Sequence, residues 1–366
     1  MSSQPCRWGI LGTAGIARKN WHSIRNSGNG VVVAVASRDP QKAARFVDEC
    51  QAAVPFPHPP RATTYEELLL SPDVDAVYVP LPTGIRRDWV IRAAQARKHV
   101  VCEKPCGVHA GDVAAMVAAC RDNQVQFMDG VMFAHSRRLE RMREILQDGH
   151  SIGEIRRITS QFSFRGDDEF QRHNIRVNGQ LEPLGCLGDL GWYNIRLTLW
   201  LMDHQLPESV SGRLLRAVDG PAGAPPVPLE FSGELFFPGG VTASFYCSFV
   251  TEMQQWADVS GTLGRLFLRD FVLPYYGSEV AFDVYQDVFS VSGCQFNMEE
   301  HARRVPVSEY SNNAPSAQES NLFRNFGHAV QTAKLEPHWA EAPLLVQRVL
   351  DACLESSRSD GKRVPV

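Results

Sequence analysis

The sequence predicts an α/β protein of two domains: a doubly wound parallel sheet at the N-terminus, then an α+β domain with a large, open and mostly antiparallel sheet. Two patterns indicate this. Short apolar segments of strand type alternate with amphipathic helical segments up to about residue 130. Longer strand-type segments with a hairpin signal then follow one another. For a chain of 366 residues we therefore expect domains at 1–134 and 135–366.

Composition argues against several classes of function. The formal net charge of -4 gives no reason to expect nucleic acid or an acidic membrane as a partner. The nine cysteines are scattered and form no CxxC pair, which argues against a disulfide framework and a metal site and for a reducing compartment. No apolar run reaches membrane-spanning length, and the N-terminus lacks a secretory pattern. We expect a cytoplasmic protein.

The first strand, Arg7–Leu11, leads into the turn Gly12-Thr13-Ala14-Gly15-Ile16 and then a helical segment. Strand, small-residue turn and helix form the context of a dinucleotide fingerprint, because backbone N–H groups and a helix N-terminus meet the pyrophosphate there. Ala14 occupies the position of the second glycine and adds a methyl group. A plain tight turn therefore remains an alternative.

The second strand, Val31–Ala36, ends in Ser37 and Arg38. An NAD site places an acid on the ribose diol at this point, whereas an NADP site prefers a hydroxyl and a cation for the 2′-phosphate. Ser37 and Arg38 fit NADP, and Lys42 adds charge one turn into the next helix. Asp39, before Pro40, fits a helix N-cap. We expect NADP, with NAD as the second choice.

Two further strands end at the same predicted edge of the sheet. Asp75–Val79 is followed by Pro80-Leu81-Pro82, and His99–Cys102 by Glu103-Lys104-Pro105. A residue before proline is biased away from helix, so Lys104 should project from a strand end into the crevice where open α/β sheets bind ligands. Such a lysine can orient a hydroxyl or stabilise negative charge. A solvated lysine paired with Glu103 is the alternative. Helices are expected at 65–70, 85–96 and 111–123, and a last strand at 126–129.

The second domain opens with a basic helix, 136–147, whose charge we assign mostly to a solvated face. Strands are expected at 155–164, 210–217, 229–237, 241–250 and 257–270, the last broken by glycines. Gly239-Gly240 signals a hairpin, and 221–228 is a loop rich in proline and glycine. Two C-terminal helices, within about 316–357, should pack back on the first domain.

The segment Leu187-Gly-Asp-Leu-Gly-Trp-Tyr193 predicts a buried helix despite its glycines, which we expect to permit a close approach by another element. Asp189 and Tyr193 are four residues apart and share a helix face. Close to a lysine ammonium and an oxidised nicotinamide, the tyrosine anion is favoured, which suits a general acid/base. The alternative is a core tyrosine and an aspartate that meets the helix dipole.

Taken together, these motifs resemble the glucose–fructose oxidoreductase / inositol dehydrogenase / MocA (Gfo/Idh/MocA) family. Glu103-Lys104-Pro105 is the most specific of them, and the resemblance implies that Lys104 is the catalytic lysine. Many members carry Asp-x-x-x-His where this chain has Asp189-x-x-x-Tyr193, so it is similar to the tyrosine-bearing branch, with dimeric dihydrodiol dehydrogenase and plant-type uncharacterised oxidoreductases. The resemblance implies a Rossmann domain, a homodimer through the second sheet, and often a cis peptide bond before Pro105. Arg86 stands where members often have a histidine.

The function expected is hydride transfer between NADP and a sugar, polyol or vicinal diol, with Lys104 and Tyr193 as an acid–base pair and Asp189 holding substrate hydroxyls and positioning Lys104. An aldehyde or dicarbonyl reductase and a non-catalytic dinucleotide or sugar sensor are the alternatives. Candidate substrate contacts are His135, Asn174 and Arg176, although a histidine such as His135 is more often a core residue. Candidate cofactor contacts are Gly12, Thr13, Ala14, Gly15, Ile16, Ser37, Arg38, Lys42, Pro80, Leu81, Pro82, Glu103 and Lys104.

Overall fold

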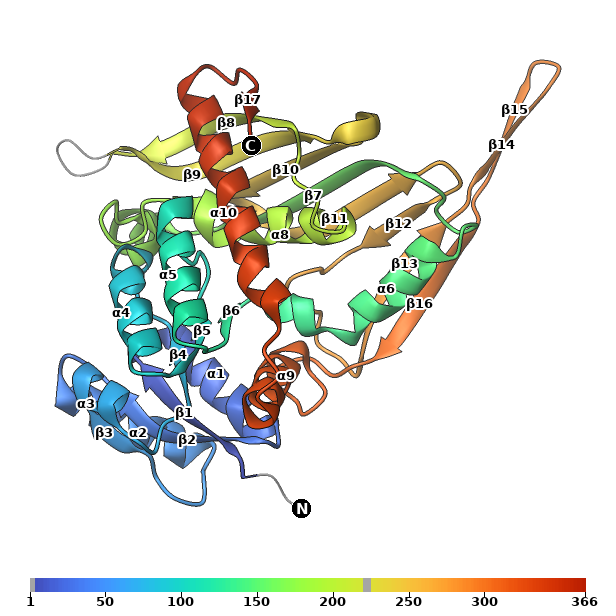
Figure 1. Ribbon diagram of the computed structural model, residues 1–366. Helices are drawn as coiled ribbons and strands as arrows, with labels where there is room; N and C mark the ends of the chain where they lie inside the picture. Colours follow the sequence, from blue (N-terminus) through green and yellow to red (C-terminus); the bar gives the residue numbers. More distant parts are fainter. Residues whose placement is uncertain (1–3, 220–224) are drawn as a thin grey trace.

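The computed structural model describes residues 4–219 and 225–366. Its first part is a six-stranded sheet in the order β3-β2-β1-β4-β5-β6, and all its strand pairs are parallel (Figure 1). The predicted doubly wound sheet is confirmed, and β3 is an additional strand. The strands are β1 (Cys6–Leu11), β2 (Gly30–Ala36), β3 (Arg61–Thr63), β4 (Ala76–Val79), β5 (His99–Cys102) and β6 (Phe127–Asp129).

The strand order reverses beside β1, which pairs with β2 on one side and β4 on the other. In open α/β sheets ligands bind outside the carboxyl ends of the strands at such a switch point. The Asp39 side chain caps α2 by accepting a hydrogen bond from Gln41 N at 2.9 Å, and Pro40 is the first helical residue, as predicted. The connecting helices are α1 (Gly15–Asn26), α2 (Pro40–Ala53), α3 (Tyr65–Leu70), α4 (Thr83–Gln95) and α5 (Ala110–Asp122).

The second part is a nine-stranded sheet in the order β16-β13-β12-β11-β7-β10-β9-β8-β17, antiparallel except where β10 meets β7. This confirms the predicted open, mostly antiparallel sheet. Of the predicted loop 221–228, residues 221–224 lie outside the described residues, and 227–228 belong to β9. The strands are β7 (Ile155–Arg165), β8 (Ser209–Val218), β9 (Val227–Phe236), β10 (Thr242–Ser248), β11 (Val250–Gly261), β12 (Arg265–Leu268), β13 (Glu279–Tyr285), β16 (Ala302–Ser308) and β17 (Val364–Pro365).

One face of this sheet forms the second core. Core-facing residues such as Ile158 are buried, whereas their outward neighbours are partly exposed. Helix α6 (Arg137–Gln147) packs on the core side. Its basic charge is mostly solvated, as predicted, since Arg137 and Arg141 are exposed, and Arg138 is the buried exception. Arg138 is 1% exposed and pairs with Asp270 at 2.6 Å from Nη1 to Oδ1. The helices that follow are α7 (Asp168–His173) and α8 (Trp192–Leu201).

The C-terminal helices α9 (Gln318–Thr332) and α10 (Pro337–Arg358) contact the first sheet: α9 packs on α1 and β1, and α10 on α5 and β6 (Figure 1). The ring of Phe323 on α9 lies edge-on to Trp8 at 5.2 Å and to Tyr78 at 5.7 Å. A 3-10 turn, Met132–His135, separates β6 from α6, and the domain boundary at 134/135 remains a prediction. Within the two described ranges, no helix combines the length and apolarity that a membrane span requires.

We expect Phe323→Ala to lower the free energy of unfolding by about 3–5 kcal/mol, because it leaves a cavity between α9 and the first sheet. Phe323 is 1% exposed. Chemical denaturation measures the loss. Leu70→Ala, at a residue 81% exposed, is the matched control and should change stability by less than about 0.5 kcal/mol. Equal losses in the two variants would contradict this account of α9.

Candidate active site

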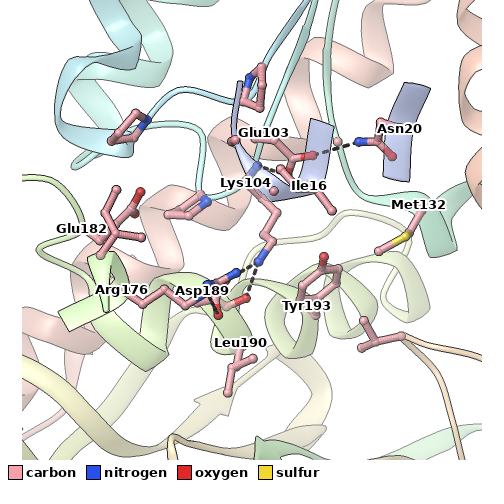
Figure 2. A pocket seen from close by; sticks show the side chains of 18 of the residues that line it. Ile16, Asn20, Glu103, Lys104, Met132, Arg176, Glu182, Asp189, Leu190 and Tyr193 are labelled. Atoms are coloured by element: carbon pink, nitrogen blue, oxygen red, sulfur yellow. Dashed lines mark hydrogen bonds and ion pairs between the residues drawn. The ribbon is translucent and has the colours of Figure 1, made fainter. Parts of the chain in front are cut away.

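A cavity of about 800 Å³ lies between the two parts of the chain. The first sheet supplies the residues that follow β1, β4 and β5, and the second part supplies the segment before α8 and the end of β7 (Figure 2). The volume is in the range of small-molecule and cofactor sites. The switch point of the first sheet therefore opens into this cavity.

Lys104 extends from the end of β5 into this cavity. Its ammonium Nζ donates to Asp189 Oδ1 at 2.6 Å and to the Asp189 carbonyl oxygen at 2.8 Å (Figure 2). The two side chains are only 12% and 16% exposed. The Lys104–Pro105 peptide bond is cis, as the resemblance predicted. Lys104 is thus an oriented cation, which excludes the alternative of a solvated lysine paired with Glu103.

The predicted buried helix is confirmed, and Asp189 lies in a π-helical turn at its start, Leu187–Gly191, which runs directly into α8. Single π turns are frequent at functional sites because they change the direction of a few side chains and carbonyls. Here both a carboxylate oxygen and the carbonyl of Asp189 meet one ammonium group. Gly188 makes this possible, since a Cβ there would lie 3.1 Å from Pro105 Cγ and 2.5 Å from Leu184 Cβ.

Tyr193 stands in the first turn of α8, 5% exposed, with Lys104 Nζ 4.8 Å from its ring centroid. Helix α8 is tied to the first sheet by Asp129, at the end of β6. The Asp129 carboxylate accepts hydrogen bonds from Trp192 Nε1 and Arg196 Nε, each at 3.4 Å. The amine and the phenol therefore come from different domains and meet at one wall of the cavity.

Burial shapes the electrostatics of the pair. Burial alone would raise the pKa of Asp189, but the charges of Lys104 and Arg176 outweigh it and lower that pKa, so Asp189 is a carboxylate. Burial, together with the charges of Glu103 and Asp189, raises the pKa of Tyr193 well above its usual value. From the neighbouring lysine we had expected a lowered pKa for Tyr193, so this expectation was wrong. Within the protein itself, the phenol keeps its proton.

The three candidate substrate residues are not gathered in one place. Asn174 and Arg176 line the cavity, and Arg176 Nε donates to Asp189 Oδ2 at 2.9 Å. His135 lies outside the cavity lining, with its ring 5.8 Å from that of Trp339. Burial lowers the pKa of His135 to about 3, so it is neutral. Its surroundings are those of a packed core histidine.

The edge that follows β1 fits a dinucleotide. Gly12 has φ +121°, helix α1 begins without a side-chain cap and without an acid in its first turn, and a Cβ at Gly15 would meet nothing within 4 Å. An uncapped helix N-terminus with free space in front of it suits a pyrophosphate. Ala14, Gly15, Ile16, Pro80, Leu81, Pro82, Glu103 and Lys104 line the cavity, whereas Gly12, Thr13, Ser37, Arg38 and Lys42 are not in its lining.

Glu103 is already engaged within the protein. Its carboxylate accepts hydrogen bonds from Tyr78 Oη at 2.5 Å and from Lys104 N at 3.2 Å. Burial raises the pKa of Tyr78 well above its usual value, which leaves its hydroxyl as a donor to Glu103. Glu103 therefore holds the backbone at Lys104 in place, and its side chain also lines the cavity.

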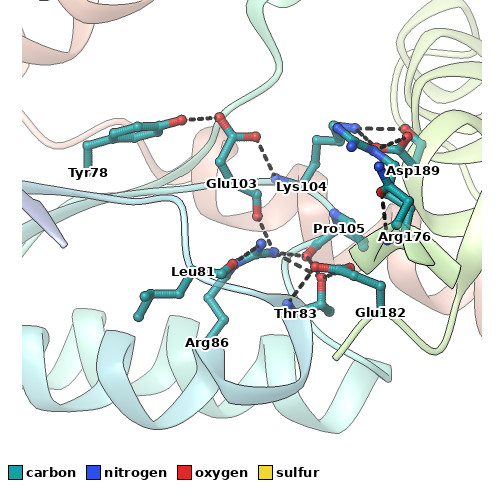
Figure 3. A network of polar contacts seen from close by, with 11 residues as sticks. Tyr78, Leu81, Thr83, Arg86, Glu103, Lys104, Pro105, Arg176, Glu182 and Asp189 are labelled. Carbon is teal, nitrogen blue, oxygen red and sulfur yellow. Dashed lines mark hydrogen bonds and ion pairs between the residues drawn. The ribbon is translucent and has the colours of Figure 1, made fainter. Parts of the chain in front are cut away.

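Two further residues form a network that sequence reasoning missed (Figure 3). Arg86, 3% exposed, donates to the carbonyls of Leu81 and Glu103, at 2.9 and 2.8 Å, and to that of Pro105. Arg86 thus ties the loop after β4 to the loop that carries Lys104. The sequence held one sign of this role: Arg86 stands where the family resemblance implies a histidine.

The second missed residue is Glu182, from the loop before the π turn. Its carboxylate accepts hydrogen bonds from Thr83 N at 3.0 Å and Thr83 Oγ1 at 2.6 Å, at the start of α4 (Figure 3). A negative charge at a helix N-terminus is favourable. Glu182 therefore fastens the second domain to the first across the cavity, and no pattern in the sequence indicated this.

Comparisons with known proteins agree with this geometry. A family model described as "Oxidoreductase family, NAD-binding Rossmann fold" (GFO_IDH_MocA) matches residues 6–131, and the "GFO/IDH/MocA C-terminal domain" matches residues 139–267. A dTDP-3,4-didehydro-2,6-dideoxy-alpha-D-glucose 3-reductase from Saccharopolyspora spinosa is 34% identical over 74% of this chain and 77% of its own. The trans-1,2-dihydrobenzene-1,2-diol dehydrogenase of Mus musculus is 33% identical over 73% and 76%.

Among solved structures, a 3-ketoreductase from Actinomadura kijaniata in complex with NADP and TDP-benzene superimposes with a TM-score of 0.79. It is 25% identical, and the match covers 96% of this chain and 98% of that one. The similarity therefore extends across both domains and the cavity between them.

We expect Arg86→Met to lower the free energy of unfolding by about 2–4 kcal/mol, because buried carbonyls at two loops lose their donor. Chemical denaturation measures this change. The neighbouring Arg87→Met is the matched control, since the Arg87 side chain is 48% exposed and its loss should cost less than about 0.5 kcal/mol. If both variants unfold alike, Arg86 does not hold these loops together.

Proposed function

The chain belongs to the Gfo/Idh/MocA family of NAD(P)-dependent oxidoreductases acting on CH–OH groups, and we propose that it uses NADP, with Lys104 and Tyr193 as its acid–base pair, on a sugar, polyol or vicinal diol. The observation that carries the proposal is the meeting of Lys104 and Tyr193 beside the first-sheet switch point. An oriented ammonium and a buried phenol are the groups that carbonyl–alcohol interconversion requires.

In this mechanism the protein handles the proton and the charge. Tyr193 gives its phenolic proton to the substrate oxygen in reduction, or receives one in oxidation. The Lys104 ammonium stabilises negative charge that develops on that oxygen. Asp189 orients Lys104 through their 2.6 Å contact. When bound, the nicotinamide supplies or accepts the hydride.

The raised pKa of Tyr193 supports the reductive direction. A phenol that retains its proton can donate it to a carbonyl oxygen. In oxidation, by contrast, the phenol must first lose its proton before it can accept one from the substrate hydroxyl. The reductases that act on keto-sugars among the relatives agree with this direction. Reduction of a ketone or aldehyde is therefore our second candidate, catalysed at the same site.

The cavity supports a ring-shaped substrate with both polar and apolar faces. Arg176 and Asn174 offer hydrogen-bond donors beside Asp189. The wall also includes the aromatic rings of Phe162, Phe164 and Phe170. A sugar, a deoxysugar or a cyclic diol presents hydroxyl groups on some edges and C–H groups on its faces, and this matches the lining.

The end of β2 supports NADP. Ser37 is buried there, with Oγ accepting from Asp39 N at 3.3 Å, and Arg38 is exposed beside it. The nearest acid, Asp39, uses Oδ1 to cap α2. A hydroxyl and a guanidinium at this strand end suit a 2′-phosphate, and a free carboxylate for a ribose diol is missing from the strand end itself.

A homodimer through the second sheet is also part of the proposal. The outward face of that sheet carries partly exposed side chains along its central strands, and no described helix packs on it. Twofold pairing of one such face is the commonest way to cover it. A non-catalytic sensor is disfavoured by the intact Lys104, Asp189 and Tyr193 set, which a binding-only protein does not need.

We expect Lys104→Met to reduce kcat by at least about a hundredfold, because the substrate oxygen loses its stabilising charge. Tyr193→Phe, which keeps the ring but removes the proton, should reduce kcat similarly. The measurement is a spectrophotometric screen of aldoses, polyols, dihydrodiols and dicarbonyls with each cofactor, repeated with the variants. NADPH binding, followed by its fluorescence, should change little. Full activity in either variant would remove that residue from the mechanism, and turnover of no substrate by the natural protein would favour the sensor.

We expect Arg38→Asp to raise the KM for NADP by at least about tenfold and to leave the KM for NAD nearly unchanged, because only NADP carries a 2′-phosphate. Steady-state kinetics with both cofactors provide the test. Arg45→Asp is the control, since Arg45 is an exposed arginine farther along α2. An equal effect of Arg38→Asp on both cofactors would contradict the assignment of NADP.

A further inference from the structure

A two-stranded ribbon stands clear of the body of the protein (Figure 1). Its strands, β14 (Val288–Ser292) and β15 (Gln295–Glu299), pair with each other and with no other described strand, and every residue of both is exposed. We call residues 288–299 the arm. An isolated two-stranded ribbon is only marginally stable in water, so an arm of this length is expected to gain stability from a surface that covers it.

The arm has one apolar face. Phe289 lies opposite Met298, and Val291 lies opposite Phe296, and residues directly opposite share a face. The rings of Phe289 and Phe296 stack with 6.1 Å between their centroids. These four side chains are between 53% and 73% exposed. The opposite face is polar and consists of Ser290, Ser292, Gln295 and Asn297 with Val288 and Glu299 at its base.

The arm continues the plane of the nine-stranded sheet. Strands β13 and β16 place Tyr285 opposite Ala302, and the arm resumes in the same register with Val288 opposite Glu299. The core-facing residues of β13 have even numbers, as Phe282 and Val284 do, and both are buried. Because side chains alternate along a strand, the apolar face of the arm looks to the same side as the outward face of the sheet.

That outward face carries an aromatic band. Tyr246, Trp256, Phe267 and Tyr285 stand on four strands and are each partly exposed, and the rings of Trp256 and Phe267 lie 6.3 Å apart. The arm cannot cover the band of its own chain, because it extends outward in the plane of that same sheet. A second copy is therefore needed to bring such a band against the arm.

We propose that the apolar face of the arm binds the outward sheet face of a second copy of this chain. The arm adds to the dimer contact of the sheets proposed above. At on the order of 200 Å² for each large side chain, and with the exposed fractions given above, the four side chains present on the order of 500 Å² per copy. Two arms then present about 1,000 Å², whereas a stable interface buries about 1,200–2,000 Å² in total, so the sheet faces must supply the rest.

Charge argues against an anionic surface as the occupant. The arm contains no lysine or arginine, and its one ionisable acid is Glu299. Surface-seated amphipathic elements that bind anionic membranes place basic residues on their polar face. The polar face of the arm has none, so a protein surface with exposed aromatic rings fits it better.

Cys294, in the turn of the arm, provides a natural probe. It is the one exposed cysteine, and the other eight are buried. An environment-sensitive maleimide dye on Cys294 should therefore report on the arm alone. Upon dilution from micromolar to nanomolar protein, we expect the dye emission to change over the same concentration range in which sedimentation velocity shows the dimer dissociating.

The variant Phe289→Ser/Phe296→Ser should raise the dissociation constant of the dimer by about tenfold or more. Ser290→Ala/Asn297→Ala, an opposed pair on the polar face, is the matched control and should leave it unchanged. An unchanged constant in the apolar-face variant, or dye emission that ignores dimerisation, would overturn the role of the arm alone. A natural protein that sediments as a monomer throughout would overturn both the arm and the sheet-mediated dimer, while the catalytic proposal is tested separately by the kinetics of Lys104→Met.

Discussion

The site depends on one ion pair that joins the two domains, between Lys104 at the end of β5 and Asp189 in the π turn. Both side chains are largely removed from water, so each charge would be costly without the other, and removal of one partner of such a buried pair typically costs about 3–5 kcal/mol. An apolar pair could hold the domains together as well. It would not place an ammonium group at the wall of the cavity. The pair therefore combines a structural contact with the preparation of a reactive group, and this explains why a polar interaction occupies the domain junction.

Three further contacts support that pair near the strand ends of the first sheet. Asp129 at the end of β6 holds the helix of Tyr193, Glu182 of the second domain reaches the start of α4, and Arg86 on α4 joins the loops after β4 and β5. Catalytic groups must be held within a fraction of an ångström by neighbours that are themselves fixed. Because these contacts surround the cavity on the first-sheet side, the amine and phenol keep their relative positions without relying on a bound ligand.

Much of this arrangement could be predicted from local sequence patterns. Apolar runs stopped by proline located the strand ends, and the spacing of Asp189 and Tyr193 placed both toward one wall. The π turn could not be predicted, because the apolar pattern of this segment fits a π turn and an α turn equally well. The burial of Arg86 and Arg138 could not be predicted either. Arg86 donates to backbone carbonyls, and Arg138 pairs with Asp270, which is distant in the sequence. The direction of the Tyr193 pKa was missed because burial, and not the neighbouring lysine, dominates it. The arm was missed because its strands bury nothing within their own chain.

Arg86, which stands where the family resemblance implies a histidine, bears on where the proton moves. Arg86 directs its donors to backbone carbonyls and is not free to exchange a proton with a ligand. His135 is packed outside the cavity and neutral, and no histidine occurs among the residues that line the cavity. The carboxylates in the lining are engaged as acceptors: Asp189 with Lys104, Glu103 with Tyr78, Glu182 with Thr83 and Glu319 with Lys19. The Lys104 ammonium is paired with Asp189. Of the titratable groups in the cavity wall, this leaves Tyr193 with a proton and without a strong partner that competes for it, which supports the proposal that its phenol exchanges the proton with the substrate.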